Sequence, residues 1–346
     1  MTTQLEVRDL TVRFRSRSAL LARLRGRPVP ALTAVDGVDL DLERGGSVGV
    51  VGESGCGKST LARALIGLVP VTEGSITFEG SPLVGRRDRM TMRRIQMVFQ
   101  DPSSSLNPSR TVGQTLMELL RVHEMVPKDQ VRRRAGELLE LVELPPSLLG
   151  AYPRRLSGGQ RQRVGIARAL ALEPAILIAD EAVAALDVSV QASVLNLLAK
   201  LRRDLGLTLL FISHDLAVVR HICDRVVVMY LGRVVEDRPT EDLFDDPRHP
   251  YTAALMAAAP RLGTKKEAGT SALPGEPPGL LVVPPGCRFH PRCPLAREIC
   301  REIEPELSGP SPEQRAACHF AWPSNGDPPA VGDPEPGLSA SRQPPG

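Results

Sequence analysis

Short apolar runs recur along the chain between longer stretches of helical periodicity. They occupy residues 47–51, 175–179, 208–212 and 226–230, and the last three follow helix-like stretches. Strands that are buried on both faces of a parallel sheet have this uninterrupted apolar character. The pattern therefore predicts an α/β fold, with strands and helices alternating from Leu5 to about Met256.

A second pattern divides the chain into parts. Residues 115–149 show helical periodicity and many charges but no strand-like run, which predicts a mostly helical insertion within about residues 101–172. Composition changes near Pro260, so we expect one domain over residues 1–257 and a small cysteine-rich C-terminal extension over residues 258–323. Residues 324–346 are too polar to form a core and are expected to be disordered.

Charge and hydropathy limit the classes of partner and the cellular locations that the sequence suggests. The net charge is +3 and aromatic residues make up 3% of the chain, which gives little drive toward nucleic acid and few platforms for base stacking. No run approaches the roughly 18 apolar residues of a membrane-spanning helix, and the N-terminus has no apolar secretory segment. We expect a cytosolic protein that serves a membrane, if at all, through a partner.

A group of arginines near the N-terminus is the main concentration of charge. It comprises Arg13, Arg15, Arg17, Arg23, Arg25 and Arg27. We expect a solvated loop here, and contact with lipid headgroups or an acidic partner surface is the alternative.

The segment after the first apolar run carries a phosphate-binding motif. It reads Gly52-Glu53-Ser54-Gly55-Cys56-Gly57-Lys58-Ser59-Thr60, a glycine, four residues and then Gly-Lys-Ser, and it opens a helix-like stretch over residues 60–68. Glycines allow backbone N–H groups to turn toward phosphate oxygens, and a helix N-terminus favours an anion. We expect Lys58 to neutralise the β- and γ-phosphates of a nucleotide and the Ser59 hydroxyl to ligate Mg²⁺. The alternative is a structural glycine-rich turn.

Two acids end the apolar run at residues 175–179. An acid at the carboxyl end of a strand beside a P-loop is positioned for magnesium, which prefers oxygen ligands. Asp180 is the candidate for that role, and Glu181 is expected to polarise the water that attacks the nucleotide.

A second glycine turn follows the helical insertion. Leu156-Ser157-Gly158-Gly159-Gln160 opens a helix-like stretch over residues 161–172 and suits a second phosphate contact, although Ser157 could be a plain helix cap. A chain with one P-loop needs no second phosphate site of its own. The two sites make sense if they serve different nucleotides, each held between two subunits.

With these motifs the chain resembles the ATP-binding subunits of ABC transporters, which are P-loop NTPases. Residues 156–160 look like the family's LSGGQ signature, and the resemblance covers roughly residues 5–323. It implies that Gln100 is the Q-loop residue that touches magnesium and senses the permease. It also implies that Asp187 lies in the loop that crosses to the partner subunit, that His214 contacts the γ-phosphate, and that Phe14 stacks on adenine.

The sequence departs from that family just after Glu181. Ala182 stands where proline is usual, and Ala184 stands where serine is usual. We expect a looser turn and the loss of a possible cross-subunit hydrogen bond. No group that hydrolysis needs is missing.

Three features resemble the oligopeptide and dipeptide importers within the family. They are the extended Q-loop at residues 100–108, the sequence DPRHPYT at residues 246–252, and the cysteine-bearing tail. The resemblance implies a second ATPase subunit, identical or homologous, two transmembrane permease subunits, a place at the cytoplasmic face of the membrane, and an extracytoplasmic peptide-binding protein. Nickel and glutathione importers share much of this pattern, so the cargo stays open.

Other classes of protein are the rival interpretations. A soluble ABC ATPase acting on ribosomes or DNA would carry two cassettes or a long coiled-coil insertion, and the chain has one cassette and no sustained heptads. A subunit that binds ATP without hydrolysing it is disfavoured by Glu181 and His214. The signature turn disfavours a simple P-loop kinase.

The tail carries four closely grouped cysteines. Structural zinc sites usually contain a C-x2-4-C pair, and none is present here; thiolates on proline-stiffened loops suit a 4Fe–4S cluster better. The family resemblance points the same way, with zinc and free thiols as the alternatives. Because the cysteines lie far in sequence from Lys58 and Glu181, we expect a structural role for this site. They are Cys287, Cys293, Cys300 and Cys318.

Overall fold

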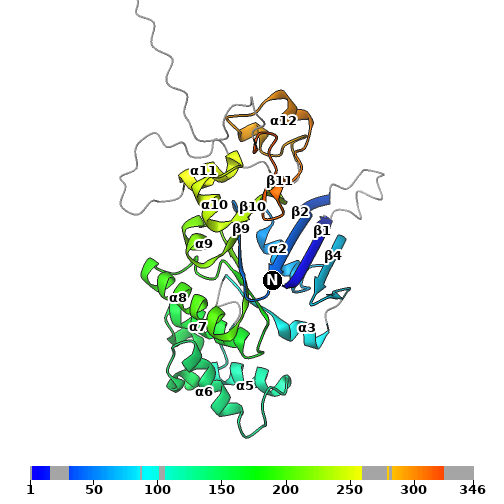
Figure 1. Cartoon of the computed structure of the whole chain (residues 1–346). Helices are drawn as coiled ribbons and strands as arrows, with labels where there is room; N and C mark the ends of the chain where they lie inside the picture. Colours follow the sequence, from blue (N-terminus) through cyan, green and yellow to red (C-terminus); the bar gives the residue numbers. More distant parts are fainter. Residues whose placement is uncertain are drawn as a thin grey trace, which may run out of the picture.

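The computed structural model describes residues 2–15, 31–85, 88–100, 106–258, 279 and 283–322. Two sheets frame this part of the chain (Figure 1). The smaller sheet is antiparallel, with strand order β2-β1-β4-β5. Its strands are β1 (Thr3–Arg15), β2 (Ala31–Glu43), β4 (Glu73–Phe78) and β5 (Ser81–Pro82).

The larger sheet has strand order β11-β12-β10-β9-β3-β8-β7-β6. Its middle is parallel, because β9, β3, β8, β7 and β6 all run the same way, and β10 and the β11–β12 hairpin add antiparallel strands at one edge. The strands are β3 (Ser47–Val51), β6 (Ile95–Val98), β7 (Ile176–Asp180), β8 (Thr208–Ser213), β9 (Arg225–Tyr230), β10 (Arg233–Pro239), β11 (Ser308–Ser311) and β12 (Gln314–Ala316).

Helices surround this sheet and connect its strands. They are α2 (Lys58–Leu65), α3 (Arg89–Arg94), α5 (Val112–Val122), α6 (Val131–Leu141), α7 (Gly158–Leu170), α8 (Val188–Leu205), α9 (Leu216–Ile222), α10 (Thr240–Asp245), α11 (Pro250–Ala258) and α12 (Glu298–Glu302). Short 3₁₀ turns lie at Pro146–Gly150, Pro153–Arg155 and His290–Arg292. The arrangement confirms the α/β prediction for the parallel part.

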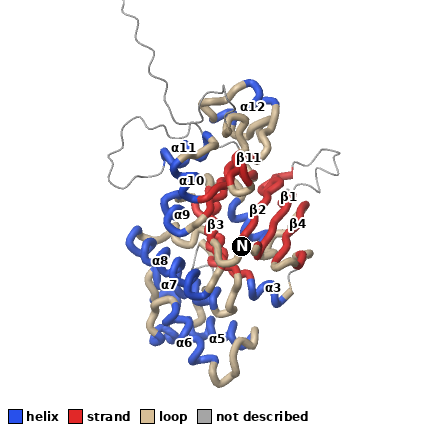
Figure 2. The backbone as a smooth tube through the Cα atoms, viewed as in Figure 1, coloured by secondary structure: helices blue, strands red, loops and turns tan. Residues whose placement is uncertain are grey.

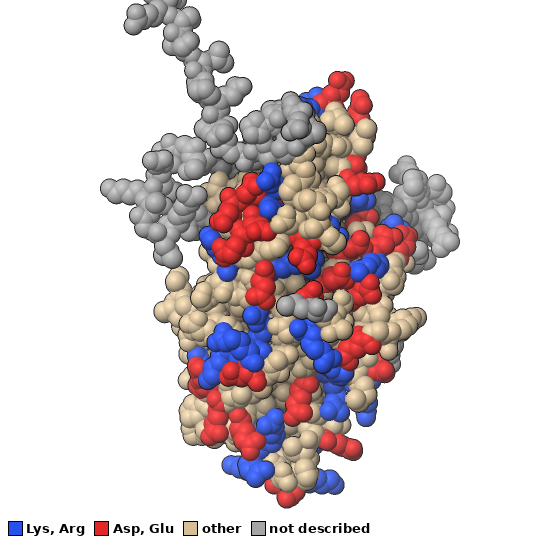
Figure 3. Space-filling view, in the orientation of Figure 1, with Lys and Arg blue, Asp and Glu red and all other residues tan. Residues whose placement is uncertain are grey.

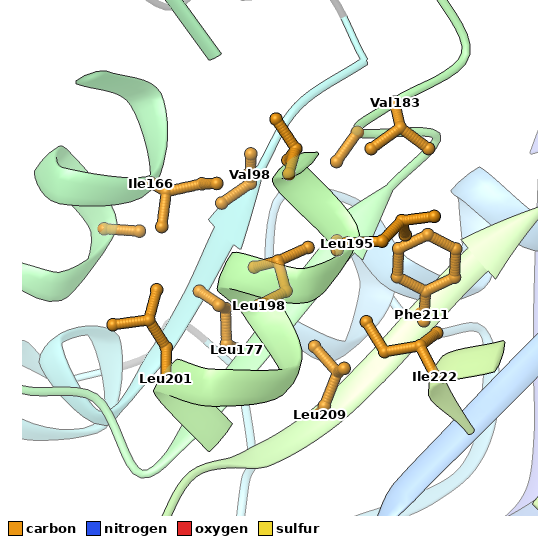
Figure 4. Close-up of a cluster of buried hydrophobic side chains, with 14 of the residues drawn as sticks. Val98, Ile166, Leu177, Val183, Leu195, Leu198, Leu201, Leu209, Phe211 and Ile222 are labelled. Atoms are coloured by element: carbon orange, nitrogen blue, oxygen red, sulfur yellow. The ribbon is translucent and has the colours of Figure 1, made fainter. Parts of the chain in front are cut away.

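The parallel strands are apolar throughout because each separates two hydrophobic cores. In β7, Ile176 and Ile178 belong to the core shared with the antiparallel sheet and α2, while Leu177 and Ala179 belong to the core under α7 and α8. Side chains alternate between the two faces of a strand, so both sets are buried. In Figure 4, Leu195, Leu198 and Leu201 of α8 pack toward β7 and β8.

The helical insertion lies at one end of the molecule, where Figure 2 shows helices rather than strands around α5 and α6. A capping box begins α5, because Thr111 Oγ1 accepts from the Gln114 N–H and the Gln114 side chain accepts from the Thr111 N–H. Leu116 of α5 and Leu139 of α6 are fully buried, which fixes the pair against α7. The helical interpretation of residues 115–149 is confirmed, with the first helix starting slightly earlier.

Two parts of the fold differ from the sequence expectation. The first strands do not alternate with helices but pair antiparallel, and a bulge at Asp9, whose φ is 47°, shifts the alternation of β1 between Val7 and Leu10. The tail is not all loop, because β12 pairs with β10 at Glu236 and Ala316.

Charged side chains are interspersed on the face seen in Figure 3, with lysine and arginine next to aspartate and glutamate. Of the arginine group, Arg13 pairs with Glu73, and residues 16–30 lie outside the described residues. Residues 101–105 and 324–346 lie outside them as well. Among the described helices, none is long and apolar enough to cross a membrane.

Candidate functional site

The carboxyl ends of four neighbouring parallel strands meet at one edge of the larger sheet. Strand β3 leads into the P-loop, β8 into His214, β7 into Asp180 and Glu181, and β6 into Gln100, and their order in the sheet is β3-β8-β7-β6. Ligands of open α/β sheets bind outside this edge. The predicted catalytic and nucleotide-binding residues of these loops therefore share one place in the fold.

The P-loop is held in a tight turn around Lys58. The lysine is 4% exposed, and its Nζ donates to the backbone oxygens of Gly52 at 2.7 Å and Glu53 at 2.9 Å. Gly57 has a φ of 109°, and a Cβ at this position would lie 2.1 Å from the Ala34 backbone oxygen. Only glycine fits there, and the loop carbonyls hold the ammonium group at the start of α2.

Ser59 and Asp180 form an oxygen-rich pair beside Lys58. Ser59 Oγ donates to Asp180 Oδ1 at 2.9 Å, and Asp180 is 3% exposed. Burial raises the pKa of this carboxyl above its ordinary value, and the hydrogen bond from Ser59 opposes that shift. A hydroxyl and a buried carboxylate are the ligands that Mg²⁺ prefers, so these two residues fit the ion.

Glu181 contacts two of the other predicted residues. Its Oε2 accepts from Gln100 Nε2 at 2.7 Å, and its Oε1 lies 3.5 Å from His214 Nδ1. The backbone φ of Glu181 is 47°, which is uncommon for a residue with a side chain, and its N–H donates to the Ile212 oxygen at 2.9 Å. A conformation held this way aims the carboxylate between the Q-loop residue and the histidine.

The signature turn belongs to a different part of the molecule. Ser157 caps α7 in a capping box with Gln160, so it is a helix cap, as the alternative interpretation predicted. A Cβ on Gly159 would lie 2.5 Å from Val190 Cγ1, because α7 packs closely on α8. Helix α7 contacts α5, α6 and α8, whereas α2 contacts β1, β2 and β7 (Figure 1).

Several predicted residues are exposed rather than gathered at the sheet edge. Ser157 is exposed, and Gln160 lines an open hollow of about 270 Å³ together with Ser189 and Val190. Asp187 precedes α8 and makes no side-chain capping bond. Phe14, near the end of β1, is 41% exposed. Ser157, Asp187 and Phe14 are thus exposed to solvent in the described structure, while Gln160 is half-buried.

The sequence of the chain matches known proteins over most of its length. The family model for ABC transporters matches residues 35–184, and the model for the oligopeptide/dipeptide transporter C-terminal region matches residues 235–300. A probable peptide ABC transporter ATP-binding protein of Sinorhizobium fredii is 52% identical over 300 residues, which is 86% of this chain and 85% of that one. This chain belongs to the ABC transporter ATP-binding family.

Two further similarities are with another relative and with a solved cassette. The oligopeptide transport ATP-binding protein AppF of Bacillus subtilis is 48% identical over 326 residues, covering 92% of this chain and 97% of that one. The dimeric structure of a post-hydrolysis ATP-binding cassette bound to ADP and phosphate has a TM-score of 0.59 and 28% identity, covering 68% of this chain and 98% of that one. This similarity supports an ABC cassette fold for the part of the chain that contains the parallel sheet.

The four cysteines of the tail of this ABC protein line one cavity of about 330 Å³. Burial raises the pKa of Cys293 to about 12 and that of Cys318 to about 11, and the neighbouring thiols add to both shifts. Backbone amides two residues further on donate to Cys287, Cys293 and Cys318, which opposes the shift by favouring the thiolates. Thiols that receive backbone amides have the donor chemistry of thiolate-bound metal groups.

The positions of the described side chains do not by themselves identify a metal at this cavity. Zinc needs its thiolates to converge on one point, with Zn–S distances of about 2.3 Å. Among the described residues, no three His, Cys, Asp or Glu side chains converge in that way.

Two side chains that contact the P-loop were missed from the sequence. Tyr251 Oη accepts from the Glu53 backbone N–H at 2.8 Å. Arg292 donates to both carboxylate oxygens of Glu53, at 2.7 and 2.9 Å. Tyr251 lies within the DPRHPYT sequence and Arg292 lies between Cys287 and Cys293. Both residues therefore belong to motifs that the sequence singled out, but their contact with the P-loop could be found only from the fold.

Proposed function

We propose that this chain hydrolyses ATP to power the import of dipeptides or oligopeptides through a membrane permease. The observation that carries the proposal is the contact of Glu181 with both Gln100 and His214, next to the buried pair Ser59–Asp180. The cargo follows the names of relatives, one of which is an oligopeptide transport ATP-binding protein. Nickel or glutathione import by the same machinery is the alternative.

The residues at the sheet edge divide the chemistry among them. The amides of residues 52–60, apart from that of Glu53, which donates to Tyr251, and the Lys58 ammonium would bind the β- and γ-phosphates of ATP once Nζ leaves the loop carbonyls. Glu181 would orient and deprotonate the attacking water, with Gln100 holding one carboxylate oxygen and His214 reaching the γ-phosphate. Mg²⁺, held by Ser59, Asp180 and Gln100, would neutralise charge on the phosphates.

A second ABC ATPase subunit, identical or homologous, would complete each site. Ser157, Gly158, Gly159 and Gln160 would bind the nucleotide of the opposite subunit, and Asp187 would contact that subunit. The outward position of this turn on α7, away from α2, supports the assignment. Exposed Phe14 is available to stack on adenine. A similar cassette has been solved as a dimer with ADP and phosphate.

The remaining partners follow from the family. Two permease subunits would contact the ATPase pair near Gln100 and move when the pair closes. An extracytoplasmic peptide-binding protein would deliver the cargo. The chain would then lie peripherally at the cytoplasmic face of the cell membrane. We assign residues 1–257 to the nucleotide-binding domain and residues 258–323 to the C-terminal extension.

For the four-cysteine cavity we propose a 4Fe–4S cluster with Cys287, Cys293, Cys300 and Cys318 as ligands. The common cavity and the amides aimed at three of the sulfurs support it. When bound, the cluster would cross-link the loops that carry these cysteines. The alternative, zinc, needs a tighter convergence of thiols.

Reconstitution tests the transport proposal directly. The chain would be assembled in vesicles with two permease subunits and an extracytoplasmic binding protein. Phosphate release would then be measured with peptide, nickel or glutathione on the binding-protein side. Stimulation by peptides alone is expected. Stimulation only by nickel or only by glutathione would identify that compound as the cargo in place of peptides. ATP hydrolysis that requires ribosomes or DNA would refute the transporter role.

A further inference from the structure

The P-loop of this chain contains a charge that opposes its ligand. Glu53 is the second residue of the loop, and a carboxylate there repels the triphosphate that Lys58 and the loop amides attract. Its side chain is 22% exposed, so water screens it only in part. A nearby cation would offset this repulsion.

Arg292 supplies that cation from the other end of the chain. It lies 239 residues away in sequence and meets Glu53 through two parallel hydrogen bonds, at 2.7 and 2.9 Å. The arginine side chain is only 5% exposed. A paired, bidentate geometry of this kind fixes position as well as charge.

Aromatic side chains hold Arg292 and the loop in place. Tyr230, Tyr251 and Phe289 form a buried group with ring centroids 4.6–5.4 Å apart. The guanidinium lies 5.9 Å from the centre of the Tyr230 ring, and Tyr251 accepts the Glu53 N–H. The carbonyl of Glu53 accepts from Lys58, so its amide, carboxylate and carbonyl all have fixed partners.

We propose that Arg292 is a positioning residue for ATP binding: by neutralising Glu53 it keeps the P-loop receptive to the triphosphate, so the C-terminal segment (residues 283–322) sets the nucleotide affinity of the cassette. The inference rests on the proposed ATP site at Lys58. It gives the C-terminal segment a role at that site, although Arg292 lies 239 residues from Glu53 in sequence.

The test measures ATP affinity of the full-length chain by titration, with and without Mg²⁺. Arg292→Met should weaken ATP binding about tenfold or more, because truncating one partner of a buried charge pair leaves the other charge uncompensated. Glu53→Gln alone should bind ATP as tightly as the parent chain or tighter. The double variant Glu53→Gln, Arg292→Met should recover most of the lost affinity.

Arg288→Met is the matched control. Arg288 is an arginine of the same segment with a side chain only 9% exposed, but it binds Asp36, Glu304 and the Leu231 oxygen rather than the P-loop. Docking of the segment can be followed by the fluorescence of Trp322, the single tryptophan of the chain. The Trp322 ring lies 5.0 Å from the guanidinium of Arg248 and 5.7 Å from that of Arg238, both outside the segment. Arg288→Met should leave ATP affinity within about twofold of the parent value, a change of less than half a kcal/mol.

The outcomes separate the inference from its rivals. The proposal would be overturned if Arg292→Met bound ATP as tightly as the parent chain while its C-terminal segment remained docked. It would also be overturned if Arg288→Met weakened ATP binding as much as Arg292→Met does and Glu53→Gln failed to restore the affinity of Arg292→Met. If Arg292→Met does not fold, weakened binding in Glu53→Gln would overturn it instead, since the carboxylate would then be needed for binding. Failure of the parent chain to bind ATP at all would refute the proposed ATP site rather than the role of Arg292.

Discussion

Glu181→Gln removes the proposed base while preserving its surroundings. The glutamine Oε1 can still accept from Gln100 Nε2, which lies 2.7 Å from the carboxylate, and the new amide can donate to His214 Nδ1, which lies at 3.5 Å. The two side chains have nearly the same volume, and the backbone φ of 47° strains both equally. We therefore expect the free energy of unfolding to change by no more than about 0.5 kcal/mol.

The catalytic effect of the same substitution should be large. An amide cannot take a proton from water, and general-base catalysis contributes roughly 10²–10⁴ in rate. Turnover of the assembled transporter should fall by that factor, while ATP binding should persist or tighten because one negative charge near the phosphates is gone. Steady-state phosphate release and ATP titration on the same preparations measure the two effects.

Glu124→Gln provides the matched control for Glu181→Gln. Glu124 also has a positive φ, 51°, but it is exposed and follows α5, away from the sheet edge. This variant should hydrolyse ATP at the parent rate. Turnover near the parent rate in Glu181→Gln would refute the assignment of Glu181 as base, and a parallel loss of ATP binding would mean that Glu181 holds the nucleotide instead.

Three further predictions concern the dimer, the tail and acid stability. Ser157→Arg should abolish turnover but leave ATP binding by the isolated chain nearly unchanged; equal loss of binding would place the turn at its own P-loop. Protein purified without oxygen should be brown with about four irons per chain, and Cys293→Ser should lose the iron; a colourless preparation with stoichiometric zinc would refute the cluster. Burial lowers the pKa of His249 to about 3, so protonation of the unfolded chain below pH 6.5 should cost about 2 kcal/mol of stability between pH 7 and pH 5. His249→Asn, which keeps an acceptor for the Tyr251 N–H, should remove most of that loss in thermal unfolding; an unchanged loss would contradict it.

The sign of the pH effect follows from which state gains the proton. The neutral imidazole of His249 is fully buried in the folded chain, with its pKa depressed, and is solvated in the unfolded chain, with a pKa near 6.5. Between these values the unfolded state binds more protons, so stability falls as the pH is lowered through about 6.5 toward 3. Above pH 7 the contribution is constant.

The sequence was sufficient for features whose cause is local. The apolar runs became β3, β7, β8 and β9 because a strand buried on both faces needs no alternation. The P-loop and the acids after β7 lie at the carboxyl ends of neighbouring strands, as the motifs require. Predicted helix starts were late by about two residues at α2 and three at α7, since glycines that looked like turn residues lead directly into the helices.

Other features depend on contacts between distant segments. The bulge at Asp9 breaks the alternation that would have marked β1 as a strand with one buried face. Strand β12 exists because β10 offers it an edge, and no property of residues 314–316 alone requires that. The ion pair Arg292–Glu53 joins the tail to the first loop, so sequence distance from Lys58 gave no guide to spatial distance.

That contact changes the relation between the tail and the nucleotide. If docking of the C-terminal segment strengthens ATP binding, linkage requires ATP to stabilise the docked segment by the same free energy. Anything that holds Cys287 and Cys293 also holds the loop between them, which carries Arg292. A group bound in the cysteine cavity would then act on the P-loop through Arg292 and Glu53 without lying next to the phosphates. A structural role for the cavity and an effect on ATP affinity would then be one property of this fold, because the loop held by the two cysteines carries the arginine that pairs with Glu53.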